Sequence, residues 1–423
     1  MATASQEITP LCTSTLSDRD RQLRRTGFIT FGLSGICSIS SGIIVSLLRE
    51  KYGLSFALTG SLLSAMSIGN VIAAFLSGFL PARVGQRAMV LVMSTEFFLG
   101  YMLTTLTGSP LFLILAFLMV GLAKGCTLNT DSVLVGRHTD NRTRDMQIMH
   151  SCYAVGALSC PMIIAALTGI GTNAPMIGIA LFGALLWCVY LLAVLPGKQK
   201  APATTVAARR VSSAPAPSST QNTPASGSAQ NAASDYSFLR TARFWLLTSL
   251  IFCQNAAETS VTGWLVTYYK DQQILTKRVA GYTMTVMWGA TLIARLLIAF
   301  VLPIRNRFRA LLVMGCGCTL MYSILVFMKA PVPAIIALFL FSFAMAGVNP
   351  MGTASVGEAL SPESMGILLP IGGIGAILFP LLIGFVADAA GLQAGMMVNL
   401  IPCIGLIMIS SALLVGGRKR RAA

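Results

Sequence analysis

The sequence predicts an all-α membrane protein with about twelve transmembrane helices in two bundles of six. Three observations support this fold class: apolar runs of about 20 residues, a shortage of charged residues, and basic residues concentrated in alternate connections. Hydrophobic residues make up 55% of the 423 residues and charged residues only 10%. That composition leaves too little polar surface for a globule in water.

The expected helices follow the apolar runs, each long enough to cross about 30 Å of hydrocarbon. They cover residues 27–48, 56–80, 88–107, 111–135, 149–170, 175–195, 242–268, 280–303, 310–328, 332–353, 365–388 and 394–416. Residues 1–26 are polar and lack an apolar run with a cleavage site, so we expect a cytoplasmic tail rather than a signal peptide. Residues 417–423 are expected to form a basic cytoplasmic tail.

Basic residues predict the orientation of the chain. Of the 30 Lys and Arg residues, 22 lie in connections on one side of the expected spans, 6 lie on the other side, and only Lys124 and Arg295 lie inside spans. Because cytoplasmic connections retain basic residues during insertion, both termini are expected in the cytoplasm. The net charge of +16 then lies beside anionic lipid headgroups, and no nucleic-acid partner is expected.

A polar segment, residues 197–240, separates the two sets of six spans. Ala, Ser, Pro, Thr, Gln and Asn dominate it, so it cannot bury enough apolar surface to offset its ordering entropy. It is expected to be a cytoplasmic linker between an N-terminal bundle (27–196) and a C-terminal bundle (241–416). Short basic turns at 81–87 and 303–309 occupy equivalent places in the two halves, which indicates a parallel repeat.

Two motifs in the first half resemble signatures of the major facilitator superfamily. The turn after the second span matches the loop signature of that family at Gly78, Arg83, Gly85 and Arg87. Ala82 stands where the family has an acid. The fifth span contains a Gly-x-x-x-Cys-Pro run that ends at Pro161 and is similar to the family's hinge. The resemblance implies gating or structural roles for Arg83 and Pro161.

The second half resembles the fucose:proton symporter family. Residues 384–391, which follow a glycine-rich run at 371–375, are similar to the end of the eleventh span in that family. Ala294-Arg295 is similar to its eighth span, which carries an arginine after a small residue. The resemblance implies a solute pathway between the two bundles and, in the characterised sugar members, proton-coupled uptake. The acids of those members in the first and fourth spans are absent here.

Ionisable residues inside spans are candidates for function, because each costs about 2.5 to 3.5 kcal/mol in hydrocarbon. Lys124 is expected to meet either an anionic group of the substrate or a structural partner, Glu96 or Glu258. Asp131 follows seven residues later, near the inner surface, where a latch to Arg83 is expected. Asn129 matches an asparagine of the fucose:proton symporter family and is a candidate for substrate binding.

The seventh span contributes Gln254, Asn255 and Glu258 to the expected substrate site. Gln254 and Glu258 are four residues apart and therefore adjacent on one face of the helix. Their amide and carboxylate can bind sugar hydroxyl groups. Glu258 is also the candidate proton carrier, and the alternative is a permanent ion pair with Arg295 or Lys124.

The eighth and tenth spans complete the expected substrate site. Trp288, Thr291 and Arg295 form one stripe that offers an aromatic plate, a hydroxyl group and a cation. This stripe fits a sugar or an anion, and Arg295 can instead be a structural residue that pairs helices. Asn349 is a candidate because Asn349-Pro350 is expected to break the tenth span beside a cavity.

These residues predict a secondary active transporter that moves a small polar solute, a sugar or sugar-like compound, inward with protons by alternating access. A transporter of a small organic anion is the alternative, and a membrane-embedded enzyme or a non-transporting sensor is a more distant one. The sequence lacks a Walker-type loop for ATP and a Ser/His/Asp set. We expect a monomer with no cofactor and no metal site, in the cell membrane, which is the inner membrane if the source is Gram-negative.

Overall fold

The computed structural model describes residues 17–422, apart from 141, 194, 196–235, 303, 305 and 360–361. Within these residues the chain forms fifteen α-helices and one 3-10 helix. They are α1 (Asp18–Tyr52), α2 (Phe56–Val84), α3 (Gln86–Leu106), α4 (Pro110–Arg137), α5 (Arg142–Thr168), α6 (Ala174–Leu192), η1 (Tyr236–Arg240), α7 (Ala242–Asp271), α8 (Lys277–Ala280), α9 (Thr283–Phe300), α10 (Arg307–Phe327), α11 (Pro331–Met345), α12 (Val348–Ala359), α13 (Pro362–Ala390), α14 (Leu392–Met397) and α15 (Leu400–Ala422).

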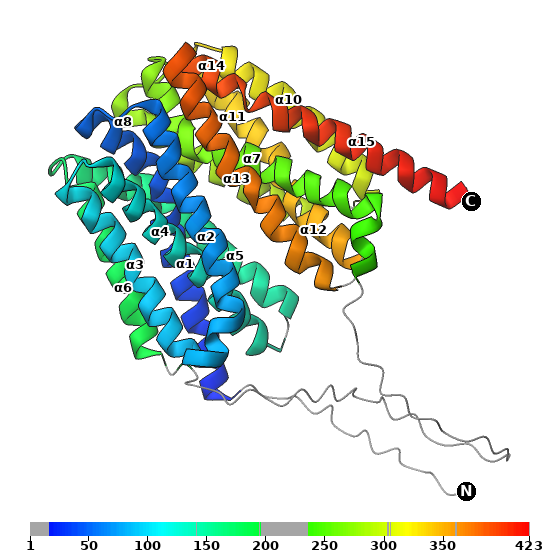
Figure 1. Cartoon of the computed structure of the whole chain (residues 1–423), viewed down its shortest axis with the longest axis horizontal. Coiled ribbons are helices and arrows are strands. Elements are labelled where there is room, and N and C mark those ends of the chain that lie inside the picture. Colours follow the sequence, from blue (N-terminus) through cyan, green and yellow to red (C-terminus); the bar gives the residue numbers. More distant parts are fainter. Residues whose placement is uncertain are drawn as a thin grey trace, which may run out of the picture.

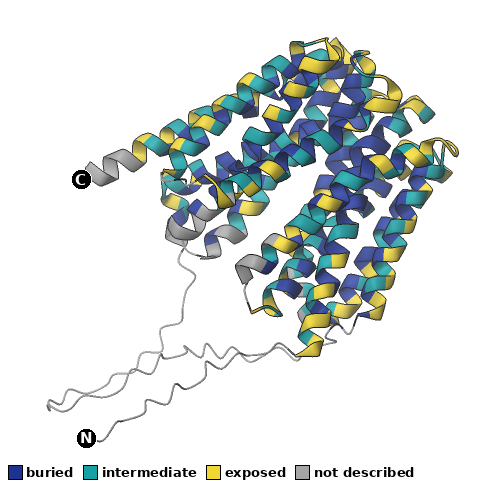
Figure 2. Ribbon diagram, turned by 180° about the vertical axis from the view of Figure 1, so that it is seen from behind, coloured by how far each residue is buried: buried dark blue, intermediate teal, exposed yellow. Residues whose placement is uncertain are grey.

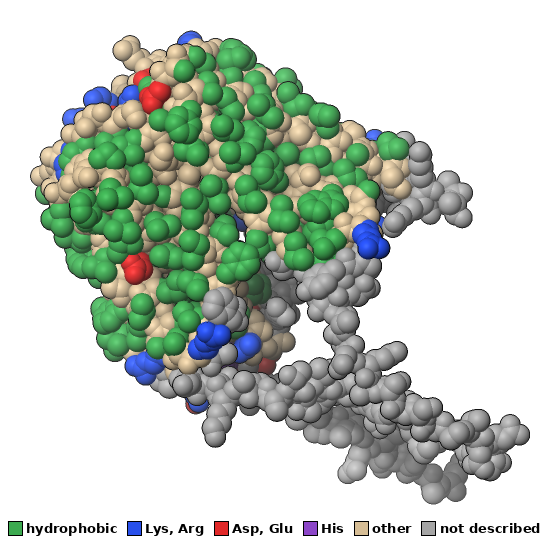
Figure 3. Space-filling view, in the orientation of Figure 1, with side chains coloured by type: hydrophobic (Ala, Val, Ile, Leu, Met, Phe, Trp, Pro, Cys, Tyr) green, Lys and Arg blue, Asp and Glu red, His purple; other side chains and the backbone are tan. Residues whose placement is uncertain are grey.

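The predicted fold class is confirmed. Eleven helical stretches are long and apolar enough to span a membrane, and α7 is the twelfth long helix. α7 carries Gln254, Asn255 and Glu258, which lower its hydropathy, and it packs against α1, α13 and α15 inside the molecule. Apolar side chains cover much of the outer face between the two ends (Figure 3), as expected for a surface in contact with lipid.

Helices α1–α6 form one group and α7–α15 form the other (Figure 1). Buried residues line the helix contacts within each group, and exposed residues gather on the outer surfaces (Figure 2). Glycine allows some of these contacts to be very close. A Cβ atom at Gly121 of α4 would overlap the carbonyl oxygen of Met66 in α2, and one at Gly156 of α5 would overlap that of Gly32 in α1.

The two groups meet at one end and separate at the other (Figure 1). We call the end where α1 begins and α6 ends the linker end, and the opposite end the far end. At the far end, the Asp388 carboxylate of α13 accepts hydrogen bonds from the backbone N–H groups of Phe56 and Ala57 in α2, both at 2.8 Å. Lys270 of α7 pairs with Glu50 of α1 at 3.2 Å. These contacts join the two bundles.

Two helix boundaries at the linker end differ from the expected ones. α1 begins at Asp18 inside the expected tail 1–26, because Ser17 caps a polar extension of the helix. Residues 1–16 lie outside the described residues. The expected turn at 81–87 is reduced to Gly85, whose φ of 91° favours glycine and directly joins α2 to α3.

Three further boundaries concern the second half. Most of the expected linker, 197–240, lies outside the described residues, and its last five residues form η1. The tenth span breaks between α11 and α12, before Asn349, rather than at Asn349-Pro350. Pro350 falls in the first turn of α12, where backbone N–H groups have no partner within the helix, so the proline fits there. α15 continues through the basic residues to Ala422.

Candidate functional site: a cavity between the bundles

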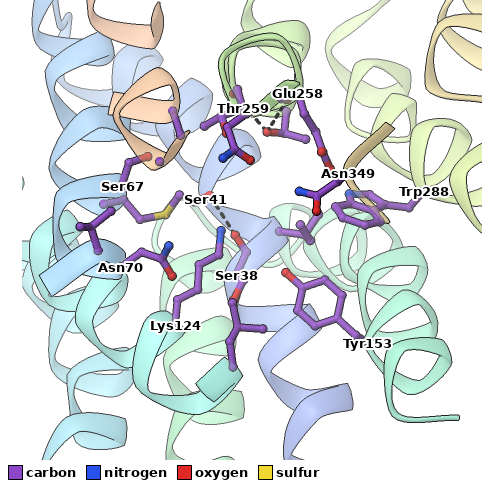
Figure 4. Close-up of a pocket in the computed structure, with 18 of the residues that line it drawn as sticks. Ser38, Ser41, Ser67, Asn70, Lys124, Tyr153, Glu258, Thr259, Trp288 and Asn349 are labelled. Atoms are coloured by element: carbon purple, nitrogen blue, oxygen red, sulfur yellow. Dashed lines mark hydrogen bonds between the residues drawn. The ribbon is translucent and has the colours of Figure 1, made fainter. Parts of the chain in front are cut away.

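A cavity of about 300 Å³ lies between the two bundles, and both supply its walls (Figure 4). One wall comes from α1, α2, α4 and α5, and the other from α7, α9, α12 and α13. The lining residues are Ser38, Ile39, Ser41, Met66, Ser67, Asn70, Val71, Lys124, Leu128, Tyr153, Asn255, Glu258, Thr259, Thr262, Trp288, Arg295, Asn349, Gly373 and Ala376. Hydroxyl and amide groups therefore outnumber charged groups in the lining.

Lys124 is the cation of the N-terminal wall. Its neighbour Gly125 lies against the backbone carbonyl of Asn70, so the close contact of α4 with α2 brings Lys124 and Asn70 into one wall. The side chain of Lys124 extends into the cavity (Figure 4). No carboxylate of a described residue lies within ion-pair distance of its ammonium group, and Glu258 faces it from the opposite wall. The predicted structural ion pairs of Lys124 with Glu96 or Glu258 are therefore absent here among the described residues.

A chain of amide hydrogen bonds orients Glu258. Asn349 Nδ2 donates to Gln254 Oε1 at 3.0 Å, and Gln254 Nε2 donates to Glu258 Oε2. The predicted adjacency of Gln254 and Glu258 on α7 is thus confirmed. Gln254 is buried, so the pair fixes one carboxylate oxygen from within the C-terminal bundle. The carboxylate is then presented to the cavity in a defined orientation.

Two aromatic residues form a corner of the cavity where α5 meets α9. The rings of Tyr153 and Trp288 lie 5.8 Å apart, centroid to centroid, at an angle of 65°. Trp288 is only 8% exposed, and its indole Nε1 is buried without a hydrogen-bond acceptor among the described residues. A buried N–H group without a partner is costly, so Trp288 carries an unsatisfied donor at this corner.

Arg295 is the second cation of the site. Its Nε donates a long hydrogen bond, 3.5 Å, to the carbonyl of Ala346, where α11 gives way to α12. A small void of about 10 Å³, lined by Gln254, Glu258, Thr291 and Arg295 among others, lies next to the central cavity. This volume is close to the minimum for one water molecule. Neither Glu258 nor another carboxylate that the structure describes forms an ion pair with Arg295.

Most expected binding residues come together in this place. Six line the central cavity: Lys124, Asn255, Glu258, Trp288, Arg295 and Asn349. Gln254 lines the small void beside it, and Asn255 also donates to the backbone carbonyl of Gly372 at 3.1 Å. Asn129 does not line either space, and its amide donates to the carbonyl of Gly125 at 2.8 Å. Five residues along a helix turn about 140° around its axis, so Asn129 points away from Lys124.

The expected gating residues lie apart from the cavity. The latch from Asp131 to Arg83 is not formed, because Asp131 is buried within its own bundle and accepts hydrogen bonds from Thr30 at 2.9 Å and Tyr190 at 2.8 Å. Arg83 is exposed in the last turn of α2. Pro161 is buried inside α5. Gating roles for these residues stay predictions.

The sequence reasoning missed several polar residues of the cavity. Ser67 and Asn70 of α2 and Thr259 and Thr262 of α7 were not proposed, although all four line it. A signal was present in α7, because Thr259 follows Asn255 by four residues and Thr262 follows Glu258 by four. Asn70 is the lone amide side chain in its apolar span, which was the corresponding signal in α2.

A family model decides the classification. Residues 26–369 match the model described as Major Facilitator Superfamily. The chain belongs to the major facilitator superfamily. It is therefore a multi-pass membrane protein of a transporter family, which excludes the alternative of a membrane-embedded enzyme.

Individual relatives are consistent with this family. An uncharacterized MFS-type transporter from Yersinia pestis is 23% identical over 392 residues, which cover 91% of this chain and 92% of that protein. Among solved structures, a variant of the nucleoside transporter NupG has a TM-score of 0.73 at 15% identity, covering 94% of this chain and 99% of that one. A bacterial homologue of the human lysosomal transporter Spinster, inward-facing and unoccupied, has a TM-score of 0.70 at 12% identity, covering 95% and 98%. These structural similarities show the fold.

Proposed function

We propose that this chain is a secondary active transporter that moves a small polar solute across the membrane by alternating access. The observation that carries the proposal is the central cavity, whose walls come from both bundles and therefore change when the bundles rock. Contacts between the bundles bridge the far end, and the bundles separate toward the linker end (Figure 1). The similar fold of an inward-facing Spinster homologue supports a state that is open at one end.

The leading substrate is a sugar or a sugar-like compound. Most polar groups in the cavity are uncharged hydroxyl and amide groups, which suit the donors and acceptors of a polyol. Trp288 adds an indole plate of the kind against which the C–H face of a sugar ring packs. The narrower resemblance to fucose:proton symporters points to the same class, and so does NupG, since nucleosides carry a sugar ring.

A small organic anion, a carboxylate or sulfonate, is the second candidate. The observation that favours it is that Lys124 and Arg295 both line the cavity without an ion pair to any described residue. Guanidinium and ammonium groups removed from bulk water bind anions strongly. The single carboxylate of the described lining, Glu258, is already bonded to Gln254.

Binding of the best ligand to three variants separates the two substrates. For a sugar, Trp288→Ala should have the largest effect, and Lys124→Gln and Arg295→Gln should each cost about 0.5 to 1.5 kcal/mol. For an anion, each charge removal should cost about 2 to 5 kcal/mol. Trp187→Ala and Arg137→Gln, both outside the cavity, serve as controls. The sugar proposal fails if charge removal abolishes binding while Trp288→Ala is mild.

Glu258 is the proposed proton carrier. Glu258→Gln keeps a hydrogen-bonding side chain next to Gln254 but cannot titrate. In proteoliposomes, this variant should lose accumulation driven by a pH gradient and retain exchange of substrate across the membrane. Undiminished concentrative uptake would remove Glu258 from that role.

The linker end is proposed to face the cytoplasm, on the basis of the uneven distribution of Lys and Arg. A cysteine at Ser219 should resist an impermeant thiol reagent in intact cells and react after the membrane is permeabilised. Efficient labelling from outside the cell would show that the linker end faces outward and that the proposed orientation is wrong.

A further inference from the structure

A second cavity, of about 180 Å³, lies between α7, α10 and α15 at the linker end of the C-terminal bundle. We call it the α7–α10–α15 groove. Its lining residues are Ala242, Arg243, Leu246, Phe308, Ala412, Leu413 and Gly416. Among the described residues of this lining, Arg243 is the one that carries a charge, and the others are apolar or small. No residue that the structure describes lines both this groove and the central cavity.

The guanidinium group of Arg243 has a hydrogen-bond donor that no described residue satisfies. Its central carbon lies 5.7 Å from the ring centroid of Phe308, and its Nε is buried without a hydrogen-bond acceptor among the described residues. A buried donor on a charged group costs free energy while it is unpaired. An acceptor with negative charge is the complement of this site, and both α7 and α10 begin beside it, where helix N-termini add positive potential.

The exposed residues near the groove indicate its depth in the membrane. Trp245 stands two residues after Arg243, is 47% exposed, and donates its indole N–H to the carbonyl of Leu239 at 2.8 Å. Val415 of α15 and Val313 of α10 are 53% and 65% exposed on the same helices. Exposed tryptophan at the edge of an apolar surface is typical of the level of lipid headgroups.

We propose that the α7–α10–α15 groove binds an anionic phospholipid. The phosphate accepts hydrogen bonds from Arg243, and guanidinium suits it because it donates in a planar fork. The upper part of an acyl chain lies along Leu246 and Leu413, which a soluble phosphate could not use. Ala412 and Gly416 leave the space that the chain fills.

Lipid binding to the purified, delipidated full-length protein tests the proposal. Phosphatidylglycerol added in a neutral detergent should bind and raise the melting temperature more than phosphatidylcholine, and native mass spectrometry should count the bound lipids. Arg243→Gln should weaken phosphatidylglycerol binding about tenfold or more, the usual scale for a lost hydrogen bond to a charged group. Ala412→Phe, which fills the groove from an exposed position and keeps the charge, should weaken it similarly.

Arg309→Gln is the matched control, because Arg309 is an exposed arginine in the first turn of α10 outside the groove. It should leave the binding of phosphatidylglycerol within about twofold of the unmodified protein, as expected for a screened surface charge. Equal losses in Arg243→Gln and Arg309→Gln would overturn the proposal, since they would indicate diffuse attraction. Unchanged binding in Ala412→Phe, or equal stabilisation by glycerol phosphate, would also overturn it.

Discussion

The two ends of the molecule are held by different kinds of contact. At the far end, Asp388 and Lys270 reach from one bundle to the other. At the linker end, the described ion pairs stay within a bundle, as when Arg24 of α1 pairs with Asp145 of α5 at 2.7 Å. In the proposed alternating-access cycle, contacts between bundles must break, whereas contacts within a bundle persist.

The ion pair within the N-terminal bundle is more shielded from water than the ion pairs between the bundles. Asp145 has a side chain that is 2% exposed, so its pair with Arg24 is shielded from water. Glu50 at the far end is 35% exposed, and its second partner, Lys277, is 78% exposed. Exposed pairs contribute little and are screened by salt. The Glu50 ion pairs at the far end are therefore weaker than the Arg24–Asp145 pair, whose carboxylate is the most shielded acidic group of these pairs and which fixes the linker end of the N-terminal bundle.

The largest effect on stability is expected from Asp145→Asn. Removing one charge of a buried pair costs about 3 kcal/mol, and slightly less here because Arg24 is partly exposed. Thermal unfolding should show the loss, while the distance between the bundles at the far end should not change. Asp18→Asn is the control, since Asp18 pairs with Arg21 at the surface. A change in conformation without a loss of stability would contradict the comparison.

Gly60→Leu should have the next largest effect, and it should act on conformation. A Cβ atom at Gly60 of α2 would come within 2.5 Å of the carbonyl oxygen of Pro380 in α13. Overpacking of this kind costs about 1 to 3 kcal/mol and would hold the far end apart. Spin labels at Thr172, which is exposed between α5 and α6, and at Gln273 should report a longer distance, and uptake should fall. Gly171→Leu, at a far-end glycine with open space around it, should do neither.

Asp388→Asn should shift the same equilibrium by about 1 kcal/mol, because it removes the charge that caps the first N–H groups of α2. The spin-label distance distribution should gain a minor population open at the far end. Asp271→Asn is a matched control, since Asp271 is an exposed acid at the far end that bonds only to its neighbour Gln272 among the described residues. An identical response in both variants would show that the effect comes from the loss of any negative charge at the far end and not from the loss of the Asp388 cap.

The smallest effect is expected from the lysine partners of Glu50. Lys270→Met should open the far end slightly more than Lys277→Met, because the Lys270 side chain is 9% exposed and the Lys277 side chain is 78% exposed. Both effects should stay below about 1 kcal/mol and shrink as salt is added. A larger effect from Lys277→Met would show that the burial of the lysine side chain does not determine the strength of these ion pairs.

Hydropathy predicted the fold because a helix that crosses the bilayer needs an apolar run as long as the hydrocarbon is thick. It also located Lys124, Glu258 and Arg295, since charges inside spans are rare. The sequence did not identify site residues of a type that also occurs often for structural reasons. Hydroxyl groups such as Ser67 often bond to their own helix backbone, so they do not stand out as ligands. The direction of Asn129 depends on helix rotation, and the partners of Asp131 depend on packing against α1 and α6.

The polarity of α7 also bears on how the chain is assembled. Glu258 and its neighbouring amides make this helix a poor candidate to leave the translocon into lipid by itself. Of the helices that cover it, α1 has already been synthesised when α7 emerges, but α13 and α15 have not. We therefore expect α7 to remain beside the N-terminal bundle or the insertion machinery during biosynthesis. Its final membrane position would then be reached only after the last helices have been made.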